Sequence, residues 1–267
     1  MDPGLEPAPL QVALLTWYAA KARPLPWRRT TDPYAILVSE VMLQQTQVAR
    51  VIPRYEAWLE RWPSAAALAA AERADVLGAW VGLGSNARAL RLRAACAVVA
   101  RDGWPQTAET LRALPGVGPY TAAAVASFAF GEQVAAVDVN VARVAARLGA
   151  GAPEALLPPG EAATFNQAMM ELGATTCRAR SADCHACPLA GWCASAGRVE
   201  VAPRAPPGSG RPRFEDTNRW VRGRVVAALA AGDELPTDIP DERLTAALEG
   251  LVRDGLVVRD GRDHSLG

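Results

Sequence analysis

The sequence contains one lysine, Lys21, among 28 basic residues, so arginine carries nearly all of its positive charge. No apolar run reaches the length of about 20 residues that a membrane-spanning helix needs. The first ten residues, MDPGLEPAPL, start acidic and have no basic flank, which does not match a secretory signal. These absences predict a cytoplasmic protein without a membrane partner.

An excess of charge is absent as well, because 28 acidic residues balance the 28 basic ones and the formal net charge is zero. Proteins that bind nucleic acid usually present a basic face, so this balance does not by itself favour such a partner. Net charge does not describe where the charges lie, however, and the arginines are clustered along the chain. A nucleic-acid partner therefore stays open at this point.

Half of the residues are hydrophobic, which is enough for one large core or two modest ones in a chain of 267 residues. Alanine is abundant, and arginine and glutamate interrupt the apolar runs at helical spacing, which predicts an all-α fold. The predicted helices cover about residues 10–22, 34–44, 47–62, 88–101, 139–148 and 161–176, with shorter helical stretches through 68–80.

The last part of the chain, residues 214–267, is predicted to form a small module of its own. It contains a helix, a second helix over about Asp241–Arg253 and a β-hairpin around Asp260-Gly261. Two helices followed by a hairpin resemble a small winged-helix module, although about 50 residues make a marginal domain. Proline, glycine and arginine dominate the preceding residues 198–213, which predicts a linker.

Four of the five cysteines are closely spaced as C-x6-C-x2-C-x5-C, at Cys177, Cys184, Cys187 and Cys193. In a cytosolic protein such a group indicates a metal site rather than disulfides, although four structural cysteines without metal are the alternative. Thiolates at this spacing can hold zinc or a [4Fe–4S] cluster, and the spacing alone does not separate the two. Cys96 stands apart within a predicted helix, where it is expected to pack in the core.

A glycine-rich turn, Leu114-Pro115-Gly116-Val117-Gly118, separates two predicted helices, and Pro119 stands where the second helix should begin. Glycines let the backbone approach a ligand closely, and the N–H groups at a helix start can point at an anion. This is the helix-hairpin-helix pattern, which grips a DNA phosphate without reading sequence. An ordinary helix-capping turn is the alternative.

Two carboxylates complete the pattern. Glu40 lies in the stretch Ser39–Gln47 (SEVMLQQTQ), within an apolar run where a merely solvated glutamate is unexpected, and Asp138 lies in V-D-V-N-V. With the hairpin, and the cysteine spacing with Pro188 after the third cysteine, these motifs resemble the iron–sulfur endonuclease III superfamily and its adenine DNA glycosylases. The resemblance covers about Leu14–Ala196.

The resemblance implies a two-lobed, all-α helix-hairpin-helix glycosylase fold around a DNA-binding cleft, with a [4Fe–4S] cluster bound by all four clustered cysteines. The implied parts are a cluster lobe, a six-helix barrel lobe that contains the hairpin, a linker, and the winged-helix-like tail. Their expected ranges are 1–28 with 136–197, 29–135, 198–213 and 214–267.

The resemblance also assigns the chemistry. Glu40 would protonate the purine, and Asp138 would stabilise positive charge on the sugar or bond to it covalently, as paired carboxylates do in glycosidases. Asn140 would orient the pair and Tyr120 would pack beside it. Tyr120 stands where strand-cutting members carry a lysine, and nothing around Lys21 indicates a site, so base removal without strand cleavage is expected.

The family's DNA contacts carry over in the same way. The base to be excised leaves the stack during flipping. Gln45 and Thr46 would then insert near the base opposite it, and Leu83 would help to wedge that opposite base. Trp27, Arg28 and Glu171 match pocket positions for the adenine, although for Trp27 a place in the core is equally compatible with the sequence. The full expected set is Trp27, Arg28, Leu43, Gln45, Thr46, Leu83, Ser85, Asn86, Gly116, Val117, Gly118 and Glu171.

The sequence departs from the family pattern at three points. Val139 stands where glycine is common, and Ser85 and Asn86 stand where the family usually has two tyrosines. In place of the larger C-terminal domain that inspects 8-oxoguanine in the family, only the short winged-helix-like tail is found. Serine cannot stack in a duplex, so recognition of the opposing base is the open question. The expected activity is excision of adenine opposite 8-oxoguanine or G in double-stranded DNA, by a monomer associated with the nucleoid. The alternatives are a glycosylase for T or U opposite G or another purine lesion, and a non-catalytic, cluster-bearing DNA-binding protein.

Overall fold

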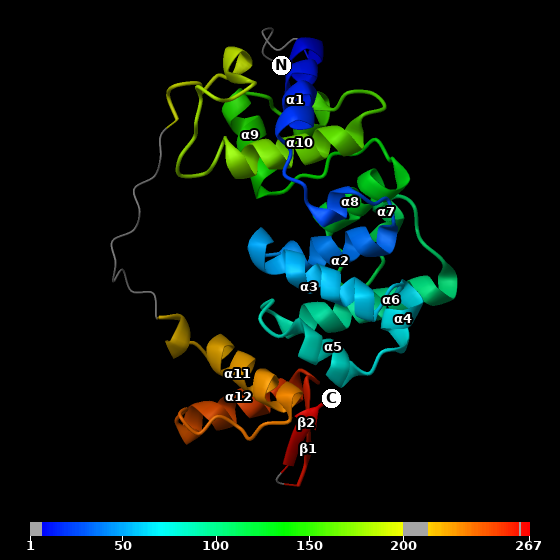
Figure 1. Ribbon diagram of the computed structural model, residues 1–267, viewed down its shortest axis with the longest axis vertical. Coiled ribbons are helices and arrows are strands. Elements are labelled where there is room, and N and C mark those ends of the chain that lie inside the picture. The colour runs from blue at the N-terminus through cyan, green and yellow to red at the C-terminus, as the bar shows by residue number, and fades with distance from the viewer. Residues whose placement is uncertain (1–6, 200–212, 262) are drawn as a thin grey trace. The chain divides into compact units, whose positions relative to one another are not determined.

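The computed structural model of the protein describes residues 7–199, 213–261 and 263–267 (Figure 1). Within these ranges the chain forms twelve α-helices and one two-stranded sheet, which confirms the predicted helical class. None of the described helices is long and apolar enough to cross a membrane. The helices are α1 (Pro7–Lys21), α2 (Pro33–Leu43), α3 (Val48–Arg61), α4 (Ala65–Ala70), α5 (Arg73–Trp80), α6 (Asn86–Asp102), α7 (Ala108–Leu111), α8 (Pro119–Phe130), α9 (Val139–Leu148), α10 (Ala162–Thr175), α11 (Asn218–Ala231) and α12 (Asp241–Arg253).

The bounds of α9 and α12 are those that the sequence predicts, whereas the helical stretch predicted through residues 68–80 is interrupted. Ala71 and Glu72 are extended there and separate α4 from α5. The side chain of Arg93 donates to the Ala71 carbonyl at 2.8 Å, so a carbonyl that helix α4 leaves unpaired at its end is satisfied. The predicted hairpin is confirmed as β1 (Val257–Asp260) paired antiparallel with β2 (Asp263–Leu266).

The chain divides into two compact units, each built from two separate stretches of sequence. Unit 1 contains Met1–Glu40 and Trp104–Arg204, and unit 2 contains Val41–Gly103 and Ala205–Gly267. This division differs from the predicted lobes, because the hairpin residues belong with the cysteine segment and the tail belongs with residues 41–103. Most of the predicted linker, 198–213, lies outside the described residues.

The core of unit 1 forms where α1 and α9 pack on α10 (Figure 1). The largest apolar side chains there, among them Leu14, Leu148 and Phe165, are at most 2% exposed. Helix α8 also contacts α10, and its alanines form a smaller apolar cluster with Ala136 and Met170. This contact explains why the hairpin belongs to unit 1 rather than to a separate barrel lobe.

The core of the tail includes a residue of helix α5. Apolar residues of α11 and α12, including Val221, Val225 and Leu251, pack around Leu77 of α5, which is fully buried. Two helices and a hairpin bury too little surface to be stable alone, and α5 supplies the missing apolar face. The tail is therefore an integral part of unit 2.

A buried carboxylate fixes the proline-rich turn after α1 to α10. Glu171 is fully buried and accepts from Arg23 at 2.7 and 2.8 Å and from Arg28 at 2.8 Å. Burial alone would raise the pKa of Glu171, but the two guanidinium groups outweigh it and hold the pKa below its ordinary value. The carboxylate is therefore ionised at neutral pH and joins two segments that are 143 residues apart.

Replacing Glu171 with alanine should lower the free energy of unfolding by about 3 kcal/mol, because it leaves the largely buried Arg28 guanidinium without its counter-charge. Urea denaturation at pH 7 measures the change. Asp102, exposed in an ion pair with its neighbour Arg101, is the matched control, and Asp102→Ala should leave the midpoint unchanged. Equal midpoints for wild type and Glu171→Ala would contradict this account.

Candidate active site

Glu40 is a buried carboxylic acid on α2. Asp32 starts this helix by accepting from the Tyr34 N–H at 3.0 Å, and an apolar sequence then buries Glu40 to 6% exposure. Burial raises the pKa of Glu40 to about 7, the hydroxyl of Tyr120 lies in hydrogen-bonding reach and opposes the rise, and the charge of Asp138 adds to it. Glu40 is therefore a proton donor poised at neutral pH.

Tyr120, in the first turn of α8, faces both carboxylates. Burial raises the pKa of its phenol well above the ordinary value, and the charges of Glu40 and Asp138 raise it further. The phenol thus keeps its proton, and its oxygen lies 3.8 Å from the sulfur of Met170. This arrangement confines Tyr120 to hydrogen bonding and packing beside the carboxylates.

Asp138 caps the start of α9, which the sequence motif did not by itself reveal. Its Oδ1 accepts from the backbone N–H groups of Asn140 and Val141 at 2.8 and 2.7 Å, and the Asn140 amide donates to Oδ2 at 2.8 Å. These three hydrogen bonds fix the position of the carboxylate at the helix start. Asp138 is half-buried, and the neighbouring Val139 is 79% exposed. The site thus pairs a buried acid of raised pKa with a helix-capping carboxylate.

Asn140 is itself held in place from the far side. Arg143 donates to the Asn140 Oδ1 and to the Gly173 carbonyl, both at 2.8 Å, and to the Cys177 carbonyl at 3.0 Å. A Cβ on Gly173 would lie 2.6 Å from the Cβ of Asn140, so only glycine allows α10 to approach α9 this closely.

Sequence reasoning missed Asn166, which fixes the loop before Asp138. This buried amide on α10 accepts from the Ala136 N–H at 3.0 Å and donates to the Ser127 hydroxyl at 3.0 Å and the Val134 carbonyl at 2.9 Å. The available signal was an asparagine in the otherwise apolar helix face around Phe165 and Met169, where a buried amide needs several partners.

The hairpin has the predicted geometry. Gly116 has a positive φ of 78°, Gly118 is the N-cap of α8, and Pro119 is the first residue of that helix. The Val117 N–H donates to the Leu114 carbonyl at 3.1 Å, and the buried Val117 side chain anchors the turn. Gly116 at the tip is exposed, so the backbone there is accessible to a ligand.

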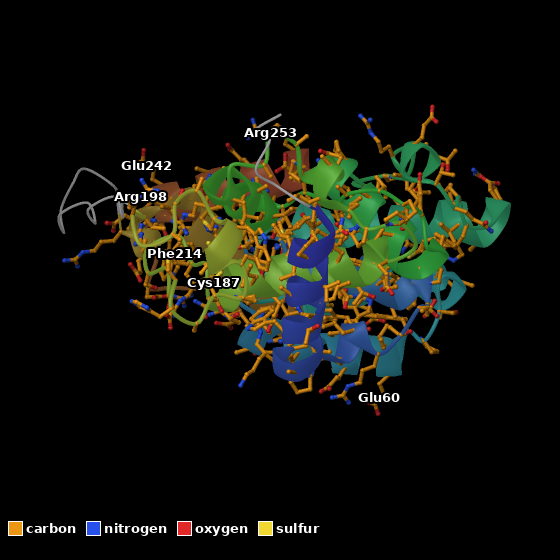
Figure 2. The ribbon with its side chains drawn as sticks, turned by 90° about the horizontal axis from the view of Figure 1, so that it is seen from above. Glu60, Cys187, Arg198, Phe214, Glu242 and Arg253 are labelled. Carbon is orange, nitrogen blue, oxygen red and sulfur yellow. The ribbon has the colours of Figure 1, made fainter. Side chains whose placement is uncertain are left out.

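The four clustered cysteines lie on the loop after α10, where Cys187 is labelled in Figure 2, and all four line one small cavity. Arg147 of α9 borders the cavity and donates to the Cys177 Sγ at 3.3 Å. Within the described ranges, no three His, Cys, Asp or Glu side chains are placed to hold a single metal ion. Cys96 is fully buried elsewhere, and burial raises the pKa of its thiol to about 12, as expected for an inert core residue.

The residues expected around the adenine have other partners. Arg28 and Glu171 pair with each other, and both carboxylate oxygens of Glu171 are engaged. Trp27 is 8% exposed in a short 3-10 helix between α1 and α2. Arg28 and Glu171 thus lie together, and the two ion pairs of Glu171 support a structural role for it.

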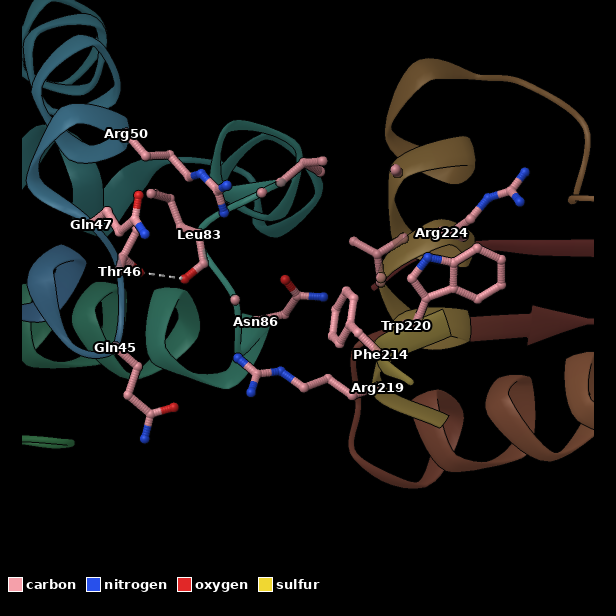
Figure 3. A pocket seen from close by; sticks show the side chains of 16 residues that line it. Gln45, Thr46, Gln47, Arg50, Leu83, Asn86, Phe214, Arg219, Trp220 and Arg224 are labelled. Atoms are coloured by element: carbon pink, nitrogen blue, oxygen red, sulfur yellow. Dashed lines mark hydrogen bonds between the residues drawn. The ribbon is translucent and has the colours of Figure 1, made fainter. Parts of the chain in front are cut away.

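The residues expected near the opposing base lie in unit 2, around a groove of about 470 Å³ (Figure 3). Gln45 has a φ of 57°, an uncommon backbone for glutamine that indicates local strain, and its side chain is exposed. Thr46 donates to the Leu83 carbonyl at 3.2 Å. Leu83 is only 1% exposed, so its side chain packs inside rather than projecting as a wedge.

The remaining members of this set are placed as follows. Leu43 ends α2 and is half-buried, and Ser85 is the exposed N-cap of α6 whose carbonyl accepts from the Trp80 indole at 3.2 Å. Asn86 lines the groove with Gln45 and Thr46. The opposite wall comes from α11, a contribution that the sequence did not reveal.

Comparisons with known proteins agree with this geometry. Residues 38–159 match the HhH-GPD superfamily of base excision DNA repair proteins. The adenine DNA glycosylase of Mycobacterium tuberculosis is 45% identical to this chain, in an alignment that covers 93% of this chain and 91% of that protein. The chain belongs to the adenine DNA glycosylase family.

More distant members of the adenine DNA glycosylase family also match this chain. The human protein is 42% identical over 76% of this chain but only 43% of its own length. Among solved structures, a thermostable thymine-DNA glycosylase is 29% identical, with a TM-score of 0.67 over 72% of this chain and 97% of that one. An endonuclease III structure, at 24% identity and a TM-score of 0.60, shares the fold. The predicted family and fold are thus confirmed, while the roles of individual residues stay predictions.

The raised pKa of Glu40 predicts that Glu40→Gln stabilises this family member at alkaline pH. Because the pKa rises from 4.5 to about 7 on folding, burial of the charged form costs little below pH 4.5 and its full amount above pH 7. That amount is on the order of 3 kcal/mol. Urea denaturation at pH 5 and pH 8 should show a stabilisation by Glu40→Gln that grows with pH.

The exposed Glu60 of α3 provides the control, since Glu60→Gln should shift stability equally at both pH values. A Glu40→Gln effect that is the same at pH 5 and pH 8 would rule out a raised pKa for Glu40.

Proposed function

We propose that this protein is a monofunctional DNA glycosylase that removes adenine opposite 8-oxoguanine or G by hydrolysing its N-glycosidic bond. The observation that carries the proposal is the pairing, within one unit, of the buried Glu40, whose pKa is raised to about 7, with Asp138, which accepts the N–H groups at the start of α9. Membership of the adenine DNA glycosylase family supports adenine as the target.

In the proposed mechanism, Glu40 donates its proton to the purine ring, so that the base leaves as a neutral molecule with the electron pair of the glycosidic bond. The sugar becomes an oxocarbenium-like cation, and the Asp138 carboxylate lies ready to stabilise it. Water then adds to the cationic carbon and releases a proton, which leaves an abasic site and free adenine. Asn140 and Tyr120 hold the two carboxylates in position.

Strand cleavage is not part of the proposed reaction. A Schiff base requires an amine, and the position after the hairpin that would supply one holds Tyr120, whose phenol keeps its proton. Lys21 is exposed at the end of α1. The alkali-labile abasic site is therefore the expected product.

The proposed substrate is double-stranded DNA with the adenine flipped out of the stack. The exposed Gly116 and the first N–H groups of α8 would hold a phosphate, with Val117 anchoring the turn and Gly118 capping the helix. The residues around Gln45 would meet the opposing base. The compact units contain both sets of contacts within one chain, which supports a monomer acting on nucleoid DNA.

The test is an excision assay on duplexes that carry A opposite 8-oxoguanine, A opposite G, T opposite G, and U opposite G, followed by alkaline cleavage. We expect products only from the two adenine duplexes and only after alkali. Glu40→Gln should slow excision by about 10²–10⁴-fold and Asp138→Asn by about 10²–10³-fold, while Glu60→Gln should match wild type. The wild-type rate should fall as the pH rises above about 7, as Glu40 loses its proton.

Two results would redirect the proposal. Products from T or U opposite G would favour the alternative that similarity to a thymine-DNA glycosylase raises. Full activity of Glu40→Gln would remove the acid from the mechanism.

We also propose that Cys177, Cys184, Cys187 and Cys193 bind a [4Fe–4S] cluster. All four line one cavity. Thiolates at this spacing could hold zinc or an iron–sulfur cube, and membership of the family that the HhH-GPD match and the adenine DNA glycosylase relatives show favours the cube. When bound, the cluster would cross-link the loop after α10, and Arg147 would balance the negative charge at Cys177.

Purified wild-type protein should therefore be brown and contain about four iron atoms per chain, with little zinc. Cys187→Ser should lose most of the iron and visible absorbance, whereas Cys96→Ala, which removes the buried fifth thiol, should retain both. Elemental analysis that finds one zinc and no iron would overturn the assignment.

A further inference from the structure

The groove of unit 2 has a wall that belongs to the tail. Phe214, Arg219, Trp220 and Arg224, from α11 and the short 3-10 helix before it, line the groove, and Phe214 and Arg219 extend toward Asn86 on the opposite wall (Figure 3). The lining holds three arginines and no acidic residue, and of the three only Arg224 is paired, with Asp238 at 2.5 Å, among the described residues. A positive groove with aromatic side chains is suited to nucleic acid, because arginine meets phosphates and base edges while rings stack on bases.

Arg219 is poised for such a ligand. Its guanidinium lies beside that of Arg88, and this like charge contributes to a pKa of Arg88 that burial already lowers. Both guanidinium groups lie 3.1 Å from the position that a Cβ on Gly84 would occupy. Arg88 is engaged with the carbonyls of Val41 and Leu83, whereas Arg219 forms no ion pair with any described residue. Neither guanidinium has a carboxylate partner among the described residues, so no negative charge there offsets the repulsion between them.

Phe214 is the second unusual feature. It is 57% exposed, although a phenylalanine ring gains most from burial. Its backbone is fixed, because Thr217 donates to the Phe214 carbonyl at 2.6 Å and accepts from the Trp220 N–H at 3.3 Å as the cap of α11. Arg224 already lies over the Trp220 ring at 5.1 Å. The ring that stays open for stacking at this groove is therefore that of Phe214.

The wall of the groove opposite α11 has no aromatic side chain among its lining residues. Ser85 caps the start of α6 and Asn86 is the first residue of that helix, and neither side chain has a ring that could stack on a base. Gln45 is held exposed in a strained backbone at the end of the helix that carries Glu40. The amides of Gln45 and Asn86 line this wall of the groove, and an amide can hydrogen-bond to the edge of a base.

We infer that α11 completes the recognition site for the base opposite the excised adenine, with Phe214 stacking on that base and Arg219 contacting its edge. The inference rests on the proposed function, since it assigns a role in the same reaction. It gives the C-terminal tail a part in substrate selection, in addition to its structural role on α5.

The test compares wild type, Phe214→Ala, Arg219→Ala and Arg219→Gln, with Arg253→Ala as the matched control. Arg253 is an exposed arginine of the same tail that does not line the groove (Figure 2). Single-turnover excision and DNA binding are measured on duplexes with adenine opposite 8-oxoguanine, G, or an abasic analogue. Binding is measured in the Glu40→Gln background to prevent cleavage, and thermal melting verifies that each variant is folded.

We expect Phe214→Ala and both Arg219 variants to lose about tenfold in affinity or excision rate opposite 8-oxoguanine or G. The loss opposite the abasic analogue should be under about twofold, and Arg253→Ala should match wild type throughout. Equal losses on all duplexes would overturn the inference, because they would indicate backbone contact only, and so would the absence of any loss. Failure of wild type to excise adenine would instead contradict the proposed function, while the binding comparison would still test the groove.

Discussion

Burial of the Glu40 carboxyl is the constraint on which the rest of the active site depends. An acid within an apolar helix is accommodated at least cost when it is neutral or paired, and here burial raises its pKa to about 7, so that it holds its proton well above the ordinary range of a carboxyl. The negative charge of Asp138 adds to this rise, and the Tyr120 hydroxyl opposes it. Two carboxyl groups of one unit thus lie in different surroundings: one lies in an apolar interior, and the other receives the N–H groups of a helix start.

The anionic partner depends on a chain of polar contacts behind it. Asn166 fixes the loop that leads into Asp138, and Arg143 holds Asn140, which in turn holds the carboxylate. Arg143 also bonds the carbonyl of Cys177. The segment that carries the cysteines is therefore mechanically continuous with the position of Asp138, so order in that loop contributes to the geometry of the site.

The motifs that carry local chemistry could be predicted from the sequence, because helix periodicity, the hairpin glycines and the cysteine spacing each act over a few residues. The positions of α9 and α12 followed from such local patterns. The contacts that depend on tertiary packing could not be predicted. Glu171 looks like a pocket residue in sequence but lies between two arginines, Leu83 is buried rather than projecting, and the tail shares the core of α5. In each case a partner distant in the chain determines the outcome.

The discontinuity of both units has a consequence for biosynthesis. Leu14 of α1 is covered by α10, and Leu77 of α5 is covered by residues from Val221 onward. Each apolar surface therefore leaves the ribosome well over a hundred residues before its partner does. Contacts between residues so far apart in the sequence form slowly, and they leave aggregation-prone apolar surface exposed during synthesis. Both cores of this protein therefore stay incomplete until translation has reached the second half of the chain. Until then their apolar residues are exposed and available to chaperones.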